Sequence, residues 1–127
     1  MLLEHFALNV SDPVAVAAWY QTHLGLTVVR HLPQANQTHF LADARGGVIE
    51  LYCNPAAPVP VYAEMHHLVL HLAFVSADPD ADRVRLLAAG ASFVEAVLPP
   101  DGSKLYMLRD PWGLALQLCC RARPLVG

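Results

Sequence analysis

Two stretches of the chain begin alike and decide the predicted fold: His5-Phe-Ala-Leu-Asn-Val-Ser-Asp-Pro13 and His71-Leu-Ala-Phe-Val-Ser-Ala-Asp-Pro79. Each starts with His, has Ala two residues later and then reaches an Asp-Pro pair at the same spacing. An Ala-rich stretch follows in both and ends at a glycine, Gly25 or Gly90. Because several matches in register are the signature of an internal repeat, we predict two copies of one structural unit.

The two halves also close on similar apolar stretches, Val48-Ile-Glu-Leu-Tyr-Cys53 and Ala115-Leu-Gln-Leu-Cys-Cys120. Glu50 follows His5 at nearly the same distance as Gln117 follows His71. Gln117 therefore takes the place in the second half that Glu50 takes in the first.

Each half is expected to fold as β-α-β-β-β. In the first half, Asp12 can cap a helix that starts at Pro13 and stops at Gly25. Strands are expected near residues 2–10, 26–32, 38–42 and 48–53, and in the second half near 68–75, 92–98, 104–108 and 114–120, with a helix at 80–89. The predicted fold is α+β. Two tandem βαβββ modules, about residues 1–54 and 66–121, share a single domain and form a curved mixed-sheet cup with the helices outside.

The composition limits the possible partners. The chain has 127 residues, 55% of them hydrophobic and 15% charged, with a net charge of −3. This suits one compact core, and no basic cluster suggests nucleic acid. No apolar run reaches the roughly 18 residues of a membrane span. Three cysteines without a signal-like N-terminus favour reduced thiols and a cytoplasmic location.

Strand alternation assigns polar side chains to one face of each sheet. His5, Ala7 and Asn9 share a face in the first strand, and Glu50 and Tyr52 share one in the fourth. The second half places His71 and Gln117 in the equivalent positions. The opposite faces are aliphatic and suit burial against a helix, so the sequence predicts a polar site as well as a core.

Two imidazoles, one carboxylate and one amide oxygen form a mixed nitrogen and oxygen donor set. Such a set suits zinc, nickel, cobalt, manganese or iron(II), and with open positions it could hold substrate oxygens. Any one of these residues taken alone is more often a surface or core residue than a ligand. Their equivalence in the repeat is what favours a metal site at His5, Glu50, His71 and Gln117.

Further residues are predicted to contact the substrate or the ligands. His39 and Tyr106 each lie eleven residues before Glu50 or Gln117. Either could support the ligands or touch substrate, or could instead be a rim residue or a packed aromatic. Asn9 and Tyr52 join this group because they share the polar face. His67 would lie about 13 Å from His71 along an extended strand, too far to share an ion with it.

The chain resembles the vicinal oxygen chelate superfamily of glyoxalase I, bleomycin-resistance proteins, fosfomycin-resistance enzymes and extradiol dioxygenases. The resemblance covers nearly the whole chain. It rests on these motifs: His5-x-Ala-x-x-Val-x-Asp, Gly25-Leu, Val48-Ile-Glu50-Leu, His71-x-Ala-Phe-Val and Asp110-Pro-x-Gly113. It implies paired βαβββ modules around a metal site, usually in a homodimer.

The resemblance also implies roles for individual residues. Bacterial glyoxalase I has His, Glu, His and Glu where this chain has His5, Glu50, His71 and Gln117. Because Gln117 cannot act as a base, Glu50 would be the catalytic carboxylate. We therefore expect a metal-dependent, glyoxalase-like lyase or isomerase acting on a small carbonyl or hydroxy-carbonyl compound.

Two other functions remain open at this point. A metal-free protein that sequesters a ligand, as bleomycin-resistance proteins do, is favoured by the neutral Gln117. An extradiol dioxygenase is less expected, because Glu50 would be its only carboxylate.

Overall fold

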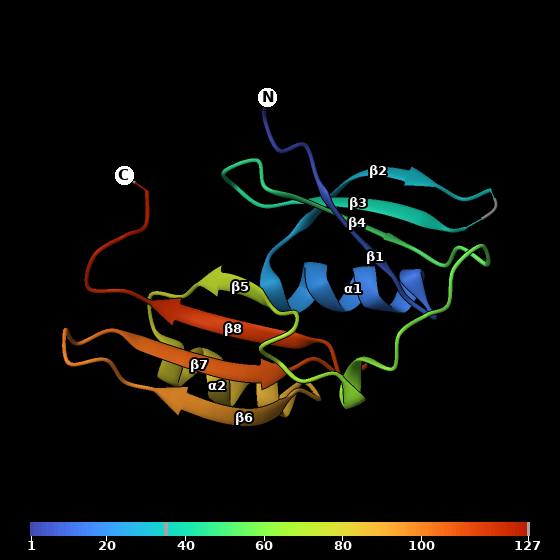
Figure 1. The fold of residues 1–127 in the computed structure, drawn as a ribbon. Coiled ribbons are helices and arrows are strands. Elements are labelled where there is room, and N and C mark those ends of the chain that lie inside the picture. Colours follow the sequence, from blue (N-terminus) through green and yellow to red (C-terminus); the bar gives the residue numbers. More distant parts are fainter. Residues whose placement is uncertain (35, 127) are drawn as a thin grey trace. The chain divides into compact units, whose positions relative to one another are not determined.

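The computed structural model describes residues 1–34 and 36–126, and it divides the chain into two compact units, Met1–Pro60 and Val61–Gly127 (Figure 1). We call them module one and module two. Module one contains β1 (Phe6–Asn9), α1 (Pro13–Leu24), β2 (Thr27–Leu32), β3 (Thr38–Ala42) and β4 (Val48–Tyr52). Module two contains the short 3-10 helix η1 (Tyr62–Glu64), β5 (Leu72–Val75), α2 (Pro79–Ala88), β6 (Ser92–Val97), β7 (Lys104–Arg109) and β8 (Ala115–Cys120). The predicted α+β class and the order of elements in each half are confirmed.

Each module has one four-stranded mixed sheet, and the two sheets have the same topology. The strand orders are β1-β4-β3-β2 and β5-β8-β7-β6. In each sheet the first and last strands of the module run parallel, and the other pairs are antiparallel. Ala7 pairs with Glu50, and Ala73 pairs with Gln117. The backbone register therefore confirms that Glu50 and Gln117 are equivalent.

The Asp-Pro pairs start both helices as predicted. The Asp12 carboxylate accepts a hydrogen bond from the amide of Ala15 at 3.0 Å, and the Asp78 carboxylate accepts one from Ala81 at 3.0 Å. Each proline takes the first helical position, where its missing N–H leaves no unmade bond. Helix α1 ends at Gly25, whose φ of 70° lies in the left-handed region.

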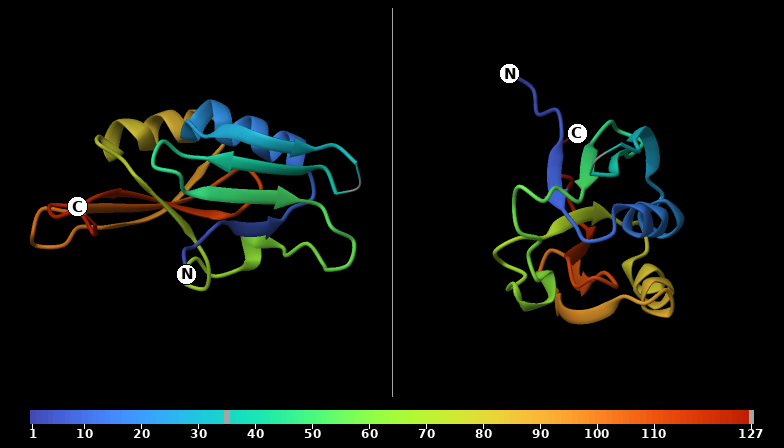
Figure 2. Two further views of the ribbon diagram at one scale, coloured as in Figure 1. Left: turned by 90° about the horizontal axis from the view of Figure 1, so that it is seen from above. Right: turned by 90° about the vertical axis from the view of Figure 1, so that its right-hand side faces the viewer.

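Each helix covers the aliphatic face of its own sheet (Figures 1 and 2). In module one, Leu41 and Leu51 are fully buried beneath α1, together with Val16 and Tyr20 of the helix itself. In module two, Leu108 and Leu116 are fully buried in the same way beneath Leu86 of α2. Burial of each such side chain contributes about 1.5–3 kcal/mol, so this face supplies the main driving force for folding.

The first strand of each module is shorter than predicted. β1 begins at Phe6, which pairs with Ile49 of β4. Before β5 the chain forms a turn, in which the amide of Val69 donates to the carbonyl of His66 at 2.9 Å. As a result, His5 and His71 each lie one residue before a strand, again in equivalent positions.

The final hairpin of each module turns around a single aspartate. In module one the Asp43 carboxylate accepts hydrogen bonds from the amides of Arg45 and Gly47, at 2.8 and 2.9 Å. In module two Asp110 accepts them from Trp112 and Leu114, at 2.9 and 3.0 Å. The carboxylates satisfy amides that the turn would otherwise leave unpaired.

The hairpin turn of module two also holds the segment that begins the module. The Arg109 guanidinium donates to the carbonyls of Tyr62, Met65 and Gly113, at 3.0, 2.9 and 2.8 Å. A β-carbon added at Gly113 would lie 2.6 Å from the backbone nitrogen of Ala63. The close approach requires glycine, and so does the φ of +92° at this residue.

Gly46 and Gly113 hold equivalent positions in the two turns, so alanine substitutions at these sites make a matched pair. Both glycines have left-handed φ values, but a β-carbon at Gly46 would meet no atom within 4 Å. We expect Gly46→Ala to lower the free energy of unfolding by about 1 kcal/mol through backbone strain alone. Gly113→Ala should cost at least about 2 kcal/mol, because the clash with Ala63 is added. Urea unfolding followed by circular dichroism measures both values, and equal losses would contradict the close approach.

Candidate functional site

His5 and Glu50 form a close pair on the open face of module one. The Nε2 atom of His5 lies 3.0 Å from Oε2 of Glu50. The other ring nitrogen, Nδ1, faces the carboxylate of Glu4. The His5 side chain is 32% exposed and that of Glu50 is 17% exposed. The pair is thus accessible to a small ligand and partly shielded from solvent.

The sheet determines this geometry. β1 and β4 are parallel neighbours, so His5, two residues before Ala7, projects on the same face as Glu50. Phe40 of β3 pairs with Glu50 across the next ladder. The edge of the His5 ring meets the Phe40 ring with centroids 5.8 Å apart. Two carboxylates and one aromatic ring therefore surround the imidazole.

These surroundings favour the protonated form of His5. The hydrogen bond to Glu4 raises the pKa of His5 above its ordinary value, and the charge of Glu50 acts in the same direction. Partial burial opposes both effects but does not cancel them. The raised pKa favours the imidazolium form of His5 between the two carboxylates, and a metal ion would have to displace its Nε2 proton.

Gln117 occupies the same place in module two, with different surroundings. It lies between Ala73 of β5 and Met107 of β7 in the register of the sheet. The thiol of Cys119 donates to the Gln117 amide oxygen, with a separation of 3.3 Å. Burial raises the pKa of the Cys119 thiol, which therefore stays protonated at neutral pH. The neutral amide is matched to a neutral donor.

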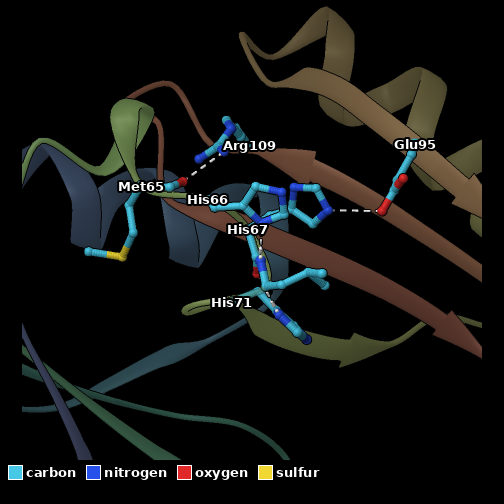
Figure 3. Close-up of polar contacts among 7 residues, drawn as sticks. Met65, His66, His67, His71, Glu95 and Arg109 are labelled. Carbon is cyan, nitrogen blue, oxygen red and sulfur yellow. Dashed lines mark hydrogen bonds and ion pairs between the residues drawn. The ribbon is translucent and has the colours of Figure 1, made fainter.

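His71 is held by backbone rather than by a carboxylate. Its Nδ1 lies 2.9 Å from the carbonyl oxygen of His67, and since a carbonyl can only accept, Nδ1 is the donor. Figure 3 shows the His71 ring directed away from the pair that His67 forms with Glu95. With Nδ1 protonated in the neutral ring, Nε2 of His71 carries the lone pair available to a ligand.

The extended path predicted between His67 and His71 is wrong. The turn before β5 brings the His67 carbonyl onto the His71 ring. The side chain of His67 instead pairs with Glu95, with Nε2 2.8 Å from Oε1, and its ring stacks on His66 (Figure 3). The sequence suggested a strand here because Leu68-Val-Leu70 is apolar and rich in strand formers.

His39 and Tyr106 lie on the helix-covered faces of their sheets. His39 pairs with Leu51 in the register, whereas its neighbour Phe40 pairs with Glu50. Tyr106 likewise pairs with Leu118, and its hydroxyl donates to Asp80 of α2 at 2.6 Å. Both side chains are more than nine-tenths buried. This placement corrects the expectation that they support the ligands, because each projects from the opposite face of its sheet.

Asn9 and Tyr52 lie on the same face as Glu50, as predicted. The Asn9 side chain donates to the carbonyls of Asn54, Ala57 and Pro58, at 3.1–3.2 Å, and accepts from the amide of Asn54 at 2.7 Å. These bonds give Asn9 a structural role in holding the segment after β4. Tyr52 is paired with Asn9 in the register and is partly exposed.

Two charged residues on the outer strands belong to the same faces and were not predicted from the sequence. Arg30 of β2 pairs with Phe40, in the row that contains Glu50. Glu95 of β6 pairs with Met107, in the row that contains Gln117. Both follow a register shift in their strand, which makes them equivalent. Simple alternation could not have placed them, because a bulge changes the face of later residues.

No single module gathers a complete metal site from its own acidic, histidine and cysteine side chains. Among residues 1–34 and 36–126, no group of three or more such side chains within either module is arranged to hold an ion. Of the four predicted ligands, His5 and Glu50 lie in module one, and His71 and Gln117 lie in module two.

No helix in the described part of the chain is long and apolar enough to cross a membrane.

A family model for the glyoxalase, bleomycin resistance protein and dioxygenase superfamily matches residues 2–118. The chain belongs to this superfamily. The match spans both modules, so the superfamily assignment includes the repeat. No curated protein matches the chain with significance.

Solved structures share the fold over more than nine-tenths of the chain. The glyoxalase family protein from Enterococcus faecalis is 27% identical, with a TM-score of 0.70 over 94% of this chain and 97% of that one. The protein SMU.1112c is also 27% identical, with a TM-score of 0.71 over 94% and 98%. A lactoylglutathione lyase from Agrobacterium tumefaciens has a TM-score of 0.64 over 93% and 92% of the chains, and its identity of 23% shows likeness of fold alone.

The position of Tyr106 leads to a prediction about acid stability. Hydrogen bonds from Lys104 and then Tyr106 lower the pKa of Asp80. A carboxyl whose folded pKa is depressed stabilises the fold above its unfolded pKa of about 3.9, and this contribution is lost as the pH falls further. We expect Asp80→Asn to flatten the decline in urea midpoint below about pH 4. Lys104→Gln should flatten it similarly, and a native-like acid profile in both variants would contradict the network.

Proposed function

We propose that the protein is a metal-dependent, glyoxalase-like lyase or isomerase that acts on a small carbonyl or hydroxy-carbonyl compound. The observation that supports this proposal is the convergence of His5 Nε2 and Glu50 Oε2 at 3.0 Å on the open face of module one. Membership of the superfamily adds support, because the two residues occupy the matched segments.

The spacing of the two donor atoms fits a shared metal ion. Zinc lies about 2.1 Å from imidazole nitrogen and from carboxylate oxygen. Two such ligands would be about 3.4 Å apart around a tetrahedral ion and about 3.0 Å apart around an octahedral one. The observed separation of 3.0 Å is close to both values, so small side-chain movements would let the pair hold a metal.

The remaining ligands in this proposal are His71 and Gln117, from the same chain or from a second copy. His71 presents Nε2, since its Nδ1 donates to a backbone carbonyl. Gln117 presents its amide oxygen, which accepts a weak hydrogen bond from the Cys119 thiol at 3.3 Å. Two imidazoles, a carboxylate and an amide would suit zinc, nickel, cobalt, manganese or iron(II).

A bound divalent ion would act as a Lewis acid that draws electron density from a chelating substrate carbonyl. The proton chemistry would fall to Glu50, the only carboxylate among the four residues. Its Oε2 faces His5, so Oε1 is the atom that would take a proton from the carbon beside the substrate carbonyl and return it. Phe40, paired with Glu50 and in edge contact with His5, would limit the access of water to this oxygen.

Metal binding by His5 provides the first test. We expect native protein, freed of metal and then titrated with Co²⁺, to bind one ion at each site that contains His5 and Glu50. His5→Ala should weaken binding by at least about 100-fold, because a first ligand is lost. His31→Ala, which removes an exposed histidine of β2, is the matched control and should bind as the native protein does. If native protein takes up none of the five metals in stoichiometric amount, the proposed function is wrong.

Gln117 provides a second test. Replacing it with glutamate adds a charged ligand at the equivalent of Glu50, and we expect Gln117→Glu to tighten Co²⁺ binding by about 10-fold or more. Gln117→Leu, which has no donor atom, should weaken binding relative to native. Isothermal titration calorimetry on the three proteins measures the order, and identical affinities would show that position 117 is not a ligand.

A metal-free binding protein is the second candidate, and the neutral Gln117 is the observation that favours it. In this case the open faces would hold an aromatic or peptide ligand by packing and hydrogen bonds. Metal-free bleomycin is a suitable probe. Saturable binding that persists in chelator, in a protein that takes up no metal, would support this function over the lyase.

A further inference from the structure

Glu4 holds the outer nitrogen of the candidate ligand His5. It lies next to His5 in the sequence, and its carboxylate contacts Nδ1 while Glu50 contacts Nε2. The Glu4 side chain is 85% exposed. A residue so exposed contributes little to packing, so its contact with the imidazole is the feature that requires an explanation.

The two nitrogens of an imidazole are chemically distinct when the ring is neutral. One carries the proton and the other carries the lone pair that binds metal, and the partner of the protonated nitrogen decides which is which. A carboxylate can only accept, so Glu4 favours a proton on Nδ1, and without metal Glu50 favours one on Nε2 in the same way. A metal ion bound to Glu50 would replace the Nε2 proton, and Glu4 would then hold the remaining proton on Nδ1.

We propose that Glu4 is a positioning residue, which accepts the Nδ1 proton of His5 and thereby presents Nε2 as the metal-binding atom. This inference rests on the proposed function. Carboxylates that hold the outer nitrogen of a ligating histidine orient the ring and increase its basicity. The Nδ1 atom of His71 is held by the His67 carbonyl instead, so the two histidines of the repeat would differ in ligand strength.

The contact between Glu4 and His5 also restrains a ring that the strand ladder does not hold. His5 precedes β1, so its backbone is not fixed by a strand ladder. Glu50 and the edge of Phe40 restrain one side of the ring. Glu4 restrains the other side, and without it the ring could turn about its Cβ–Cγ bond and exchange the two nitrogens.

Metal affinity tests this role. Metal-free protein is titrated with Co²⁺ and followed by calorimetry and by the visible spectrum of the bound ion. Glu4→Gln keeps the size of the side chain but removes the charge, and we expect it to weaken binding by about 10- to 100-fold. Glu4→Asp should recover part of the loss. Glu64→Gln removes an exposed carboxylate of η1 and should leave the affinity unchanged.

A second measurement reports on the ring without metal. Nitrogen-15 chemical shifts of the His5 ring, recorded where imidazole is neutral, distinguish the two protonated forms. In native metal-free protein the two carboxylates compete for the single ring proton, and in Glu4→Gln we expect the population to shift toward the form with the proton on Nε2, beside Glu50. A purely structural loss would instead alter the amide spectrum of module one, which serves as the check on folding.

The outcomes separate this inference from the proposed function. If native protein binds Co²⁺ and Glu4→Gln binds it equally well with unchanged ring shifts, the positioning role is wrong and the function stands. If native protein binds no metal, the proposed function fails and the metal-presenting role of Glu4 fails with it, whatever the ring shifts show. Weaker binding together with a shift of the ring proton toward Nε2 supports both.

Discussion

The parallel pairing of the first and last strands in each module is the constraint on which the site depends. β1 lies beside β4 and β5 lies beside β8, although more than thirty residues separate the paired strands in the sequence. This pairing brings His5 beside Glu50, and it requires a crossover, which the helix supplies. The helix then buries the aliphatic face of the sheet and leaves the other face to the polar residues. A single topological choice thus produces both the core and the site.

The two modules keep the residues that determine the fold more faithfully than those that determine the chemistry. The capping aspartates, the prolines after them and the hairpin aspartates are identical, and their hydrogen bonds agree to within 0.1 Å. The polar faces differ in charge, with Glu50 and Arg30 in one module and Gln117 and Glu95 in the other. The repeat therefore provides one scaffold with two differently equipped faces.

Much of this could be predicted from the sequence, because local rules govern the elements concerned. The start of α1 is marked by Asp12 and Pro13, and its end is marked by Gly25. The spacing between His5 and Glu50 recurs in the second half between His71 and Gln117. The turn before β5 was missed, because Leu68-Val-Leu70 has the composition of a strand and the turn depends on hydrogen bonds of the His66 backbone and ring. The sequence also did not predict which face of the sheet carries His39 or Tyr106, because this depends on the strand pairing across a hairpin. The sequence shows that Glu4 is next to His5. The contact between its carboxylate and Nδ1 of His5 depends on the conformation of both side chains, which the sequence does not specify.

The anchoring of the connecting segment has a consequence for the connectivity of the chain. Asn9 fastens the chain to module one as far as Pro58, and Arg109 fastens it to module two from Tyr62 onward. The interval between these anchors is short and coincides with the boundary after Pro60. Opening the peptide there would leave both sets of anchors intact. Each module therefore holds its own end of the connecting segment, and a cut between the anchors would remove none of the hydrogen bonds that fix either end.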